Sequence, residues 1–199
     1  MKIVIIKYNA GNIRSVDFAL QRMGIEAEIT GDFEKIKKAD KVIFPGVGEA
    51  STTMKYLREH KLDGLIRELK QPVLGICLGL QLMCKHSEEN DTDCIGIFDA
   101  NVKLFQPEPD EKTKYKVPHM GWNNLRDLKN GIFDASIDEQ YVYFVHSYYA
   151  ELCSETIATS EYIVPFSASL HKNNFYATQF HPEKSGPVGA RILKNFIEL

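Results

Sequence analysis

The sequence predicts an α/β fold: a mostly parallel sheet flanked by helices, with additional antiparallel strands in the C-terminal half. In the first half, short apolar runs alternate with amphipathic stretches, which is typical of parallel strands joined by helices. In the second half, runs rich in β-branched and aromatic residues follow one another closely, as antiparallel strands do. A chain of 199 residues suits one domain spanning residues 1–199.

The spacing of apolar residues defines the elements of the first half. Strands are expected at 3–6, 42–44 and 73–76, with a weaker one at 27–29. A helix is expected over 13–23, where Val16, Leu20 and Met23 share one face. Further helices are expected within 51–60 and 62–69 and over 78–86.

Residue type defines the elements of the second half. Strands are expected at 101–105, 141–152, 156–163, 166–171 and 175–180, and residues 172–174 (KNN) resemble a hairpin turn. The segment 106–114, with two prolines and five charges, is expected to be a solvated loop. The chain closes with a helix over 187–199, with Pro187 in its first turn.

Composition excludes several classes of partner. A formal charge of −3 offers no basic surface for nucleic acid, and no apolar run approaches the length that spans a membrane. The opening MKIVIIK is too short for a signal peptide. Four cysteines without CxxC pairing or zinc-like spacing are typical of a reducing cytosol. We therefore expect a cytoplasmic protein with neither a nucleic-acid nor a membrane partner.

The segment GICLG places Cys77 between two glycines, after a predicted strand and before a predicted helix. This pattern copies the nucleophile elbow GxSxG, in which side chains two residues from the nucleophile would collide on the sharp turn. A following helix stabilises a thiolate, and the N–H of Leu78 can donate to an oxyanion. The alternative is that Cys77 is a small buried apolar residue, which we expect for Cys84, Cys94 and Cys153.

A thiolate nucleophile needs a base, and six histidines compete for that role. His181 ends an apolar strand and is followed by Pro182 and Glu183. Proline stops the strand and fixes the backbone, so the Glu183 carboxylate could orient the imidazole. His60 and His86 lie in charge-rich stretches, and His171 adjoins the predicted hairpin turn. The tripeptide alone is more often a loop than a site.

The segment FPGVGEA, residues 44–50, follows a predicted strand and places Val47 between Gly46 and Gly48. Glycines make this loop flexible, so its N–H groups can face an anion. The alternative is a plain turn between a strand and a helix. Beside an elbow, the loop is a source of the second oxyanion donor.

Together these motifs resemble the class I (triad-type) glutamine amidotransferases, which release ammonia from the glutamine side chain for a synthase. The resemblance covers nearly the whole chain and implies the flavodoxin-like fold of that family. It assigns nucleophile, base and orienting carboxylate to Cys77, His181 and Glu183. It also implies that L-glutamine is the substrate and that no cofactor or metal is needed. The substrate and oxyanion residues implied are Gly46, Val47, Gly48, Leu78, Gln81, Ser147 and Tyr148.

Within this family, the signatures AGNIRSV, VPHMGWN, YFVHSYY and QFHPEKSG are most similar to the glutaminase subunit of imidazole glycerol phosphate synthase, from histidine biosynthesis. That resemblance implies a (β/α)8-barrel cyclase on a separate chain, which forms a heterodimer with this one and uses the ammonia. The interface residues expected are Tyr8, Asn12, His119, Met120, Trp122, Tyr143 and Lys184. Trp122 and Tyr143 could instead be ordinary core aromatics. The subfamily commonly opens DYGxGN, from which Lys7 and Asn9 depart.

Three rival functions remain open from the sequence. The chain could feed ammonia to a different synthase, such as one that amidates a sugar nucleotide. A cysteine peptidase of the same fold usually places a histidine directly after the nucleophile, where this chain has Leu78. A binding module that lost the chemistry would not need an intact Cys77, His181 and Glu183.

Overall fold

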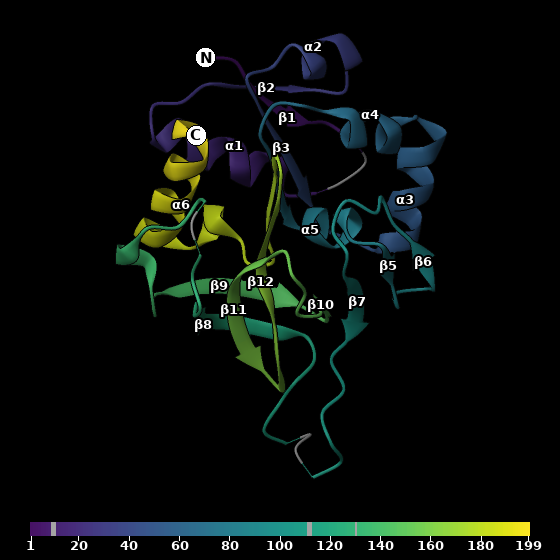
Figure 1. Ribbon diagram of the computed structural model, residues 1–199, viewed down its shortest axis with the longest axis vertical. Helices are drawn as coiled ribbons and strands as arrows, with labels where there is room; N and C mark the ends of the chain where they lie inside the picture. Colours follow the sequence, from purple (N-terminus) through teal and green to yellow (C-terminus); the bar gives the residue numbers. More distant parts are fainter. Residues whose placement is uncertain (9–10, 111–112, 130) are drawn as a thin grey trace.

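A seven-stranded sheet forms the centre of the computed structural model, which describes residues 1–8, 11–110, 113–129 and 131–199 (Figure 1). Its strand order is β11-β12-β13-β4-β3-β1-β2. The five strands from β13 to β2 run parallel, and β12 and β11 add to the β13 edge as antiparallel strands. The strands are β1 (Ile3–Ile6), β2 (Ala27–Thr30), β3 (Lys41–Gly46), β4 (Val73–Cys77), β11 (Thr156–Tyr162), β12 (Val164–Lys172) and β13 (Phe175–Thr178).

Two smaller sheets lie beside the central one. The strands β10 (Tyr148–Ala150), β7 (Asn101–Leu104), β5 (His86–Ser87) and β6 (Thr92–Asp93) form one sheet in that order. An antiparallel pair, β8 (His119–Asn124) and β9 (Tyr141–His146), forms the other. Of the segment 106–114, expected to be a solvated loop, the described residues 106–110 and 113–114 extend away from the body of the molecule (Figure 1).

Helices cover both faces of the central sheet because its strands are apolar on both faces. In β1, Val4 and Ile6 belong to one core cluster, while Ile3 and Ile5 belong to the other. The first cluster packs against α2 (Phe33–Lys37), α3 (Ala50–Glu59), α4 (Leu62–Glu68) and α5 (Leu78–Met83). The second packs against α1 (Ile13–Arg22), α6 (Gly186–Glu198) and β9. Short 3-10 helices occupy η1 (Ala135–Ile137) and η2 (Pro182–Lys184).

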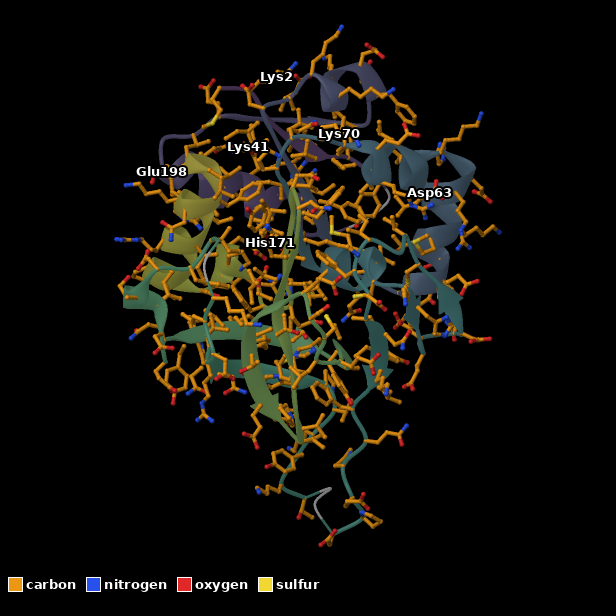
Figure 2. All side chains as sticks on the ribbon, viewed as in Figure 1. Lys2, Lys41, Asp63, Lys70, His171 and Glu198 are labelled. Carbon is orange, nitrogen blue, oxygen red and sulfur yellow. The ribbon has the colours of Figure 1, made fainter. Side chains whose placement is uncertain are left out.

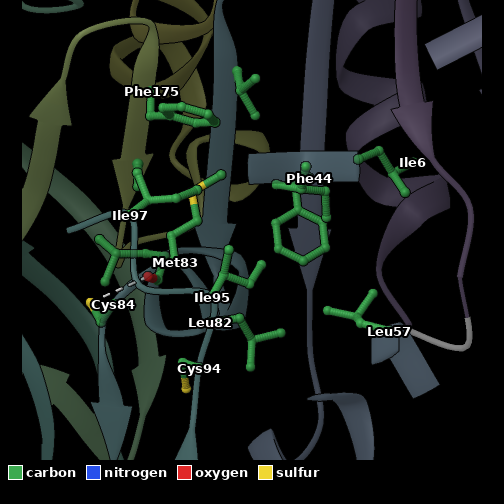
Figure 3. Packing of buried hydrophobic residues seen from close by; sticks show 14 of the residues in the cluster. Ile6, Phe44, Leu57, Leu82, Met83, Cys84, Cys94, Ile95, Ile97 and Phe175 are labelled. Carbon is green, nitrogen blue, oxygen red and sulfur yellow. Dashed lines mark hydrogen bonds between the residues drawn. The ribbon is translucent and has the colours of Figure 1, made fainter. Parts of the chain in front are cut away.

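Figure 3 shows the first cluster at close range, where Phe44, Leu57 and Leu82 pack together with two cysteines. Cys84 and Cys94 lie among the apolar side chains, as expected for structural thiols. Charged side chains such as Lys2, Lys70 and Glu198 are exposed on the outside of the molecule (Figure 2). No helix in the described ranges is long and apolar enough to cross a bilayer.

The predicted fold class is confirmed, but several local predictions are wrong. The single strand expected at 141–152 is two strands, β9 and β10, in different sheets. The helix expected over 78–86 ends at Met83, because Lys85 donates its N–H to the Ala100 carbonyl and His86 enters β5. The VPHMGWN segment, where no strand was predicted, contributes β8. In β8 the apolar Met120 and Trp122 alternate with polar or small residues, but they lie on the exposed face of the strand. The five-residue helix α2 was missed because so short an element has no clear period.

The crossing of β3, β4 and α5 depends on glycine. A Cβ added at Gly79 would overlap the main-chain oxygen of Phe44 in β3, and one at Gly75 would lie 2.9 Å from the Met83 sulfur. The predicted steric role of these two glycines is therefore confirmed. The absence of a side chain at these two positions lets β3, β4 and α5 approach more closely than any larger residue would allow.

We expect Gly79→Ala to lower the free energy of unfolding by about 3 kcal/mol or more, since the clash is with backbone that cannot rotate away. Helix propensity alone would favour alanine by about 1 kcal/mol, so a loss isolates the steric effect. Gly64→Ala in α4 is the matched control, because nothing lies within 4 Å of its added Cβ. Urea unfolding measures both variants, and equal midpoints would contradict the steric explanation.

Candidate active site

The site forms where three neighbouring parallel strands end. Cys77 is the last residue of β4 and pairs with Gly46, the last residue of β3. His181 follows β13, which is the other neighbour of β4. Because the carboxyl ends of parallel strands meet at one edge of a sheet, the topology places these three segments side by side.

Cys77 has the backbone geometry that an elbow requires. Its φ of 54° and ψ of −108° lie outside the regions that non-glycine residues usually occupy. The side chain is 7% exposed. Its sulfur lies 3.8 Å from Nε2 of Gln179 and 3.9 Å from the Val145 carbonyl oxygen. The strained turn thus presents the thiol at the sheet edge.

His181 and Glu183 form a buried pair. Nδ1 of His181 lies 2.7 Å from Oε1 of Glu183, and both side chains are inaccessible to solvent. Pro182 begins the short helix η2, which turns Glu183 back beneath the imidazole. Because Nδ1 donates to the carboxylate, Nε2 is the ring nitrogen that remains available for proton transfer. It is buried and forms no hydrogen bond within the described residues.

Electrostatics sets this histidine apart from its neighbours. Burial lowers the pKa of His181, but the negative charges of Cys77 and Glu183 outweigh that effect and raise it to about 10. The arrangement therefore favours the imidazolium form of His181 beside Cys77. Burial instead raises the pKa of Cys94 to about 12 and raises those of Cys84 and Cys153. These three thiols stay protonated and inert at neutral pH.

A pocket of about 320 Å³ opens above Cys77. Its lining includes the expected Val47, Gly48, Leu78, Gln81, Ser147, Tyr148, Cys77 and His181. The expected Gly46 is not among the lining residues, and a Cβ added there would lie 2.6 Å from the Tyr8 hydroxyl. Gln81 donates to the Tyr148 carbonyl and to Oε1 of Gln179, which fixes its amide at the pocket wall.

Four further lining residues were not expected: Glu89, Pro118, Val145 and His146. Glu89 accepts the Ala50 N–H at the start of α3, and burial raises its pKa. His146 contacts a second buried histidine, with His119 Nδ1 lying 3.0 Å from its Nε2. Burial lowers the pKa of His146 to about 3 and that of His119 to about 4, so both are neutral. Glu89 lies in a turn whose sequence carries no signal for a pocket.

The expected interface residues divide into two groups. Met120 and Trp122 are 64% and 55% exposed on β8, Tyr143 is half-buried beside Trp122, and Lys184 is exposed. Tyr8 and His119 are buried, so the expectation that their side chains contact a partner at the surface is wrong. Tyr8 packs on Phe44 and donates to the Pro45 carbonyl, and His119 stacks between aromatic rings.

Asn12 is half-buried and contacts the His181–Glu183 pair. Its Nδ2 donates to Oε1 of Glu183 at 2.6 Å. Of the two departures from the subfamily opening, Lys7 is exposed and Asn9 lies outside the described residues. No cluster of three or more metal-ligating side chains occurs in the part of the chain that the structure describes.

The family model described as glutamine amidotransferase class-I matches residues 5–199. The chain belongs to the class I glutamine amidotransferase family. A protein of Bacteroides fragilis named "Imidazole glycerol phosphate synthase subunit HisH" is 62% identical over 199 residues, covering 100% of each chain. Proteins of the same name from Idiomarina loihiensis and Haemophilus influenzae are 44% and 45% identical, each over 100% of this chain and 98% of the relative.

Solved structures share this family fold at low sequence identity. A crystal structure titled glutamine amidotransferase superimposes with a TM-score of 0.73 at 20% identity, covering 98% of this chain and 97% of that one. PurLQS from Thermotoga maritima gives a TM-score of 0.72 at 14% identity, covering 99% and 97%. At these identities the likeness concerns the fold alone.

Proposed function

We propose that this chain is the glutaminase subunit of an imidazole glycerol phosphate synthase, in which it hydrolyses L-glutamine and passes ammonia to a separate cyclase. The observation that carries the proposal is the buried His181–Glu183 pair beside the elbow cysteine. The names of full-length relatives with up to 62% identity support the choice of synthase. Four unpaired cysteines support a cytoplasmic location.

The geometry suggests the following reaction. The Cys77 thiolate attacks the side-chain carbonyl carbon of glutamine, forming a carbon–sulfur bond and an oxyanion. The N–H of Leu78 and one from the Val47–Gly48 loop stabilise that oxyanion. Nε2 of His181 gives its proton to the amide nitrogen, the carbon–nitrogen bond breaks, and ammonia leaves. Water then attacks the thioester and gives a proton to Nε2, and glutamate departs as the thiolate re-forms.

The pocket suits the other end of glutamine as well. Glutamine carries an α-ammonium group, and Glu89 places a carboxylate on the pocket wall. An ion pair between Glu89 and the α-ammonium group would orient the substrate in the pocket that Glu89 shares with Cys77. Two hydrogen bonds already fix the side-chain amide of Gln81, so this side chain need not become ordered when the substrate binds.

The exposed face of the β8–β9 pair is our proposed cyclase contact. It joins the catalytic segment directly, because Tyr143 in β9 accepts the His181 N–H and donates its own N–H to Ser185. Met120, Trp122 and Tyr141 expose large apolar side chains on this pair. Monomer surfaces rarely gather such groups without a partner. Ammonia released at His181 would then leave close to the interface.

We expect the isolated chain to hydrolyse glutamine slowly, because a free glutaminase would waste its substrate. The Gly46–Val47–Gly48 loop can reorient a peptide easily. We therefore expect the second oxyanion donor to be the element that is out of place in the isolated chain. Adding the cyclase and its nucleotide ligand should raise kcat by about 10²-fold or more, the effect of one oxyanion donor, with less change in KM.

Glutamate release is measured for the chain alone, with cyclase, and with cyclase plus nucleotide. Full-speed hydrolysis by the isolated chain, unchanged by any cyclase, would favour an independent hydrolase of the same fold. Activation by a different synthase, such as one that amidates a sugar nucleotide, would keep the glutaminase chemistry and replace the partner.

A further inference from the structure

The side chain of Asn12 contacts the catalytic pair and leaves its own helix uncapped. An asparagine directly before a helix usually accepts an N–H of the first turn, which is worth about 1 kcal/mol. Here it makes no such bond to α1. Its Nδ2 instead donates to Oε1 of Glu183, across 171 positions of the chain. A local bond is thus given up for a long-range one.

Two donors converge on the same oxygen of Glu183. Nδ1 of His181 and Nδ2 of Asn12 lie 2.7 Å and 2.6 Å from Oε1, and 3.4 Å from each other. The other oxygen, Oε2, is buried without a hydrogen bond to any described residue. A carboxylate held by one donor can turn about its last carbon–carbon bond. The second donor fixes which oxygen faces the imidazole.

The backbone around Asn12 supports this contact. Asn12 adopts a left-handed conformation, with φ 70° and ψ −3°, which asparagine tolerates better than most residues. Farther along α1, Nη2 of Arg22 approaches the main-chain oxygen of Glu183 at 3.5 Å. Helix α1 therefore contacts both the side chain and the backbone of Glu183. Asn12 is not among the residues that line the substrate pocket.

We infer that Asn12 is a positioning residue: it holds the Glu183 carboxylate so that Nδ1 of His181 stays bonded and Nε2 faces Cys77. The inference rests on the proposed glutaminase function and deepens it. It gives Asn12 a role inside the active site, where the sequence suggested only a place at the partner interface.

Two substitutions separate the side chain from the backbone. Asn12→Gly and Asn12→Asp both tolerate the left-handed conformation, so the start of α1 is preserved. Losing a hydrogen bond to a charged group should lower kcat for glutamate release about 10- to 100-fold. Asn12→Asp should lose more, because its carboxylate repels Glu183. KM for glutamine should stay within about twofold, since Asn12 does not touch the substrate.

Rates are measured with saturating cyclase, so that an effect on docking does not enter. Gln21→Ala is the matched control: it lies on the same helix, and within the described residues its side chain hydrogen-bonds only to Asp17. Its kcat should equal that of the unaltered chain. Thermal unfolding of each variant reports whether α1 has been disturbed.

A double-mutant cycle tests whether Asn12 acts through Glu183. In a Glu183→Ala background the carboxylate is gone, so Asn12→Gly should change kcat by less than about threefold. An equal fold-loss in both backgrounds would overturn the inference, as would an Asn12→Gly variant with full kcat. If the unaltered chain with cyclase releases no glutamate at all, the proposed function fails, which is a distinct result.

Discussion

Replacing Cys77 with serine is expected to lower glutamine-dependent turnover by about 10⁴- to 10⁶-fold, the loss seen when the nucleophile of a catalytic triad is removed. Serine fits the same strained turn, so the fold should survive. Its hydroxyl lacks the acidity that lets a thiolate form beside the protonated His181. The measurement is glutamate release by the chain with saturating cyclase.

Cys153→Ser is the matched control. Cys153 is half-buried and far in the chain from the elbow, and its thiol contacts the Thr156 hydroxyl, which serine can also do. This variant should keep its turnover. Synthesis supplied with free ammonia should proceed normally with Cys77→Ser, because only ammonia release is lost. Substantial glutamine turnover by Cys77→Ser would refute the assignment of the nucleophile.

The second large effect is expected at His181. His181→Ala removes both the proton donor for ammonia and the partner that stabilises the thiolate, so kcat should fall about 10⁴-fold or more. Glu183→Gln should cost less. The side chain introduced at position 183 can keep its carbonyl oxygen at the Oε1 position. Its amide nitrogen then takes the place of Oε2, which has no hydrogen bond to any described residue. The geometry of the imidazole is then retained while the charge is lost.

The loss of the Glu183 charge should change the pKa of His181 in a defined direction. Glu183 is one of two negative groups that raise the pKa of His181 to about 10. Removing it lowers this pKa, so the thiolate–imidazolium pair should give up its proton at a lower pH in Glu183→Gln. The pH dependence of Cys77 alkylation by iodoacetamide, followed by peptide mass spectrometry, reports the change. An unchanged kcat for Glu183→Gln at saturating glutamine would remove Glu183 from the catalytic set.

The parts of this site that sequence could predict are those fixed by local sterics. GICLG required glycine on both sides of the nucleophile because β4 and α5 meet there, and the added Cβ contacts at Gly75 and Gly79 bear this out. The run His181-Pro182-Glu183 predicted a turn, since proline ends a strand. The alternating strands and helices likewise predicted a mostly parallel sheet flanked by helices, but not the order of its strands.

What sequence could not predict depends on contacts between distant segments. Nothing near Glu89 indicates that the turn after β5 reaches the pocket, because that placement comes from its bond to Ala50. Tyr8 and His119 belong to motifs that suggested an interface, yet both point inward. Asn12 bonds to Glu183 instead of capping α1, and local propensity favours the opposite choice.

The position of β13 in the sheet has a consequence for protein synthesis. β13 lies between β4 and β12, and it leads directly to His181 and Glu183. Cys77 and Asn12 leave the ribosome long before these residues do. A nascent chain that ends before β13 lacks His181 and Glu183, and its β4 would be an edge strand of the sheet. We therefore expect unfinished copies of the enzyme to be unable to hydrolyse glutamine.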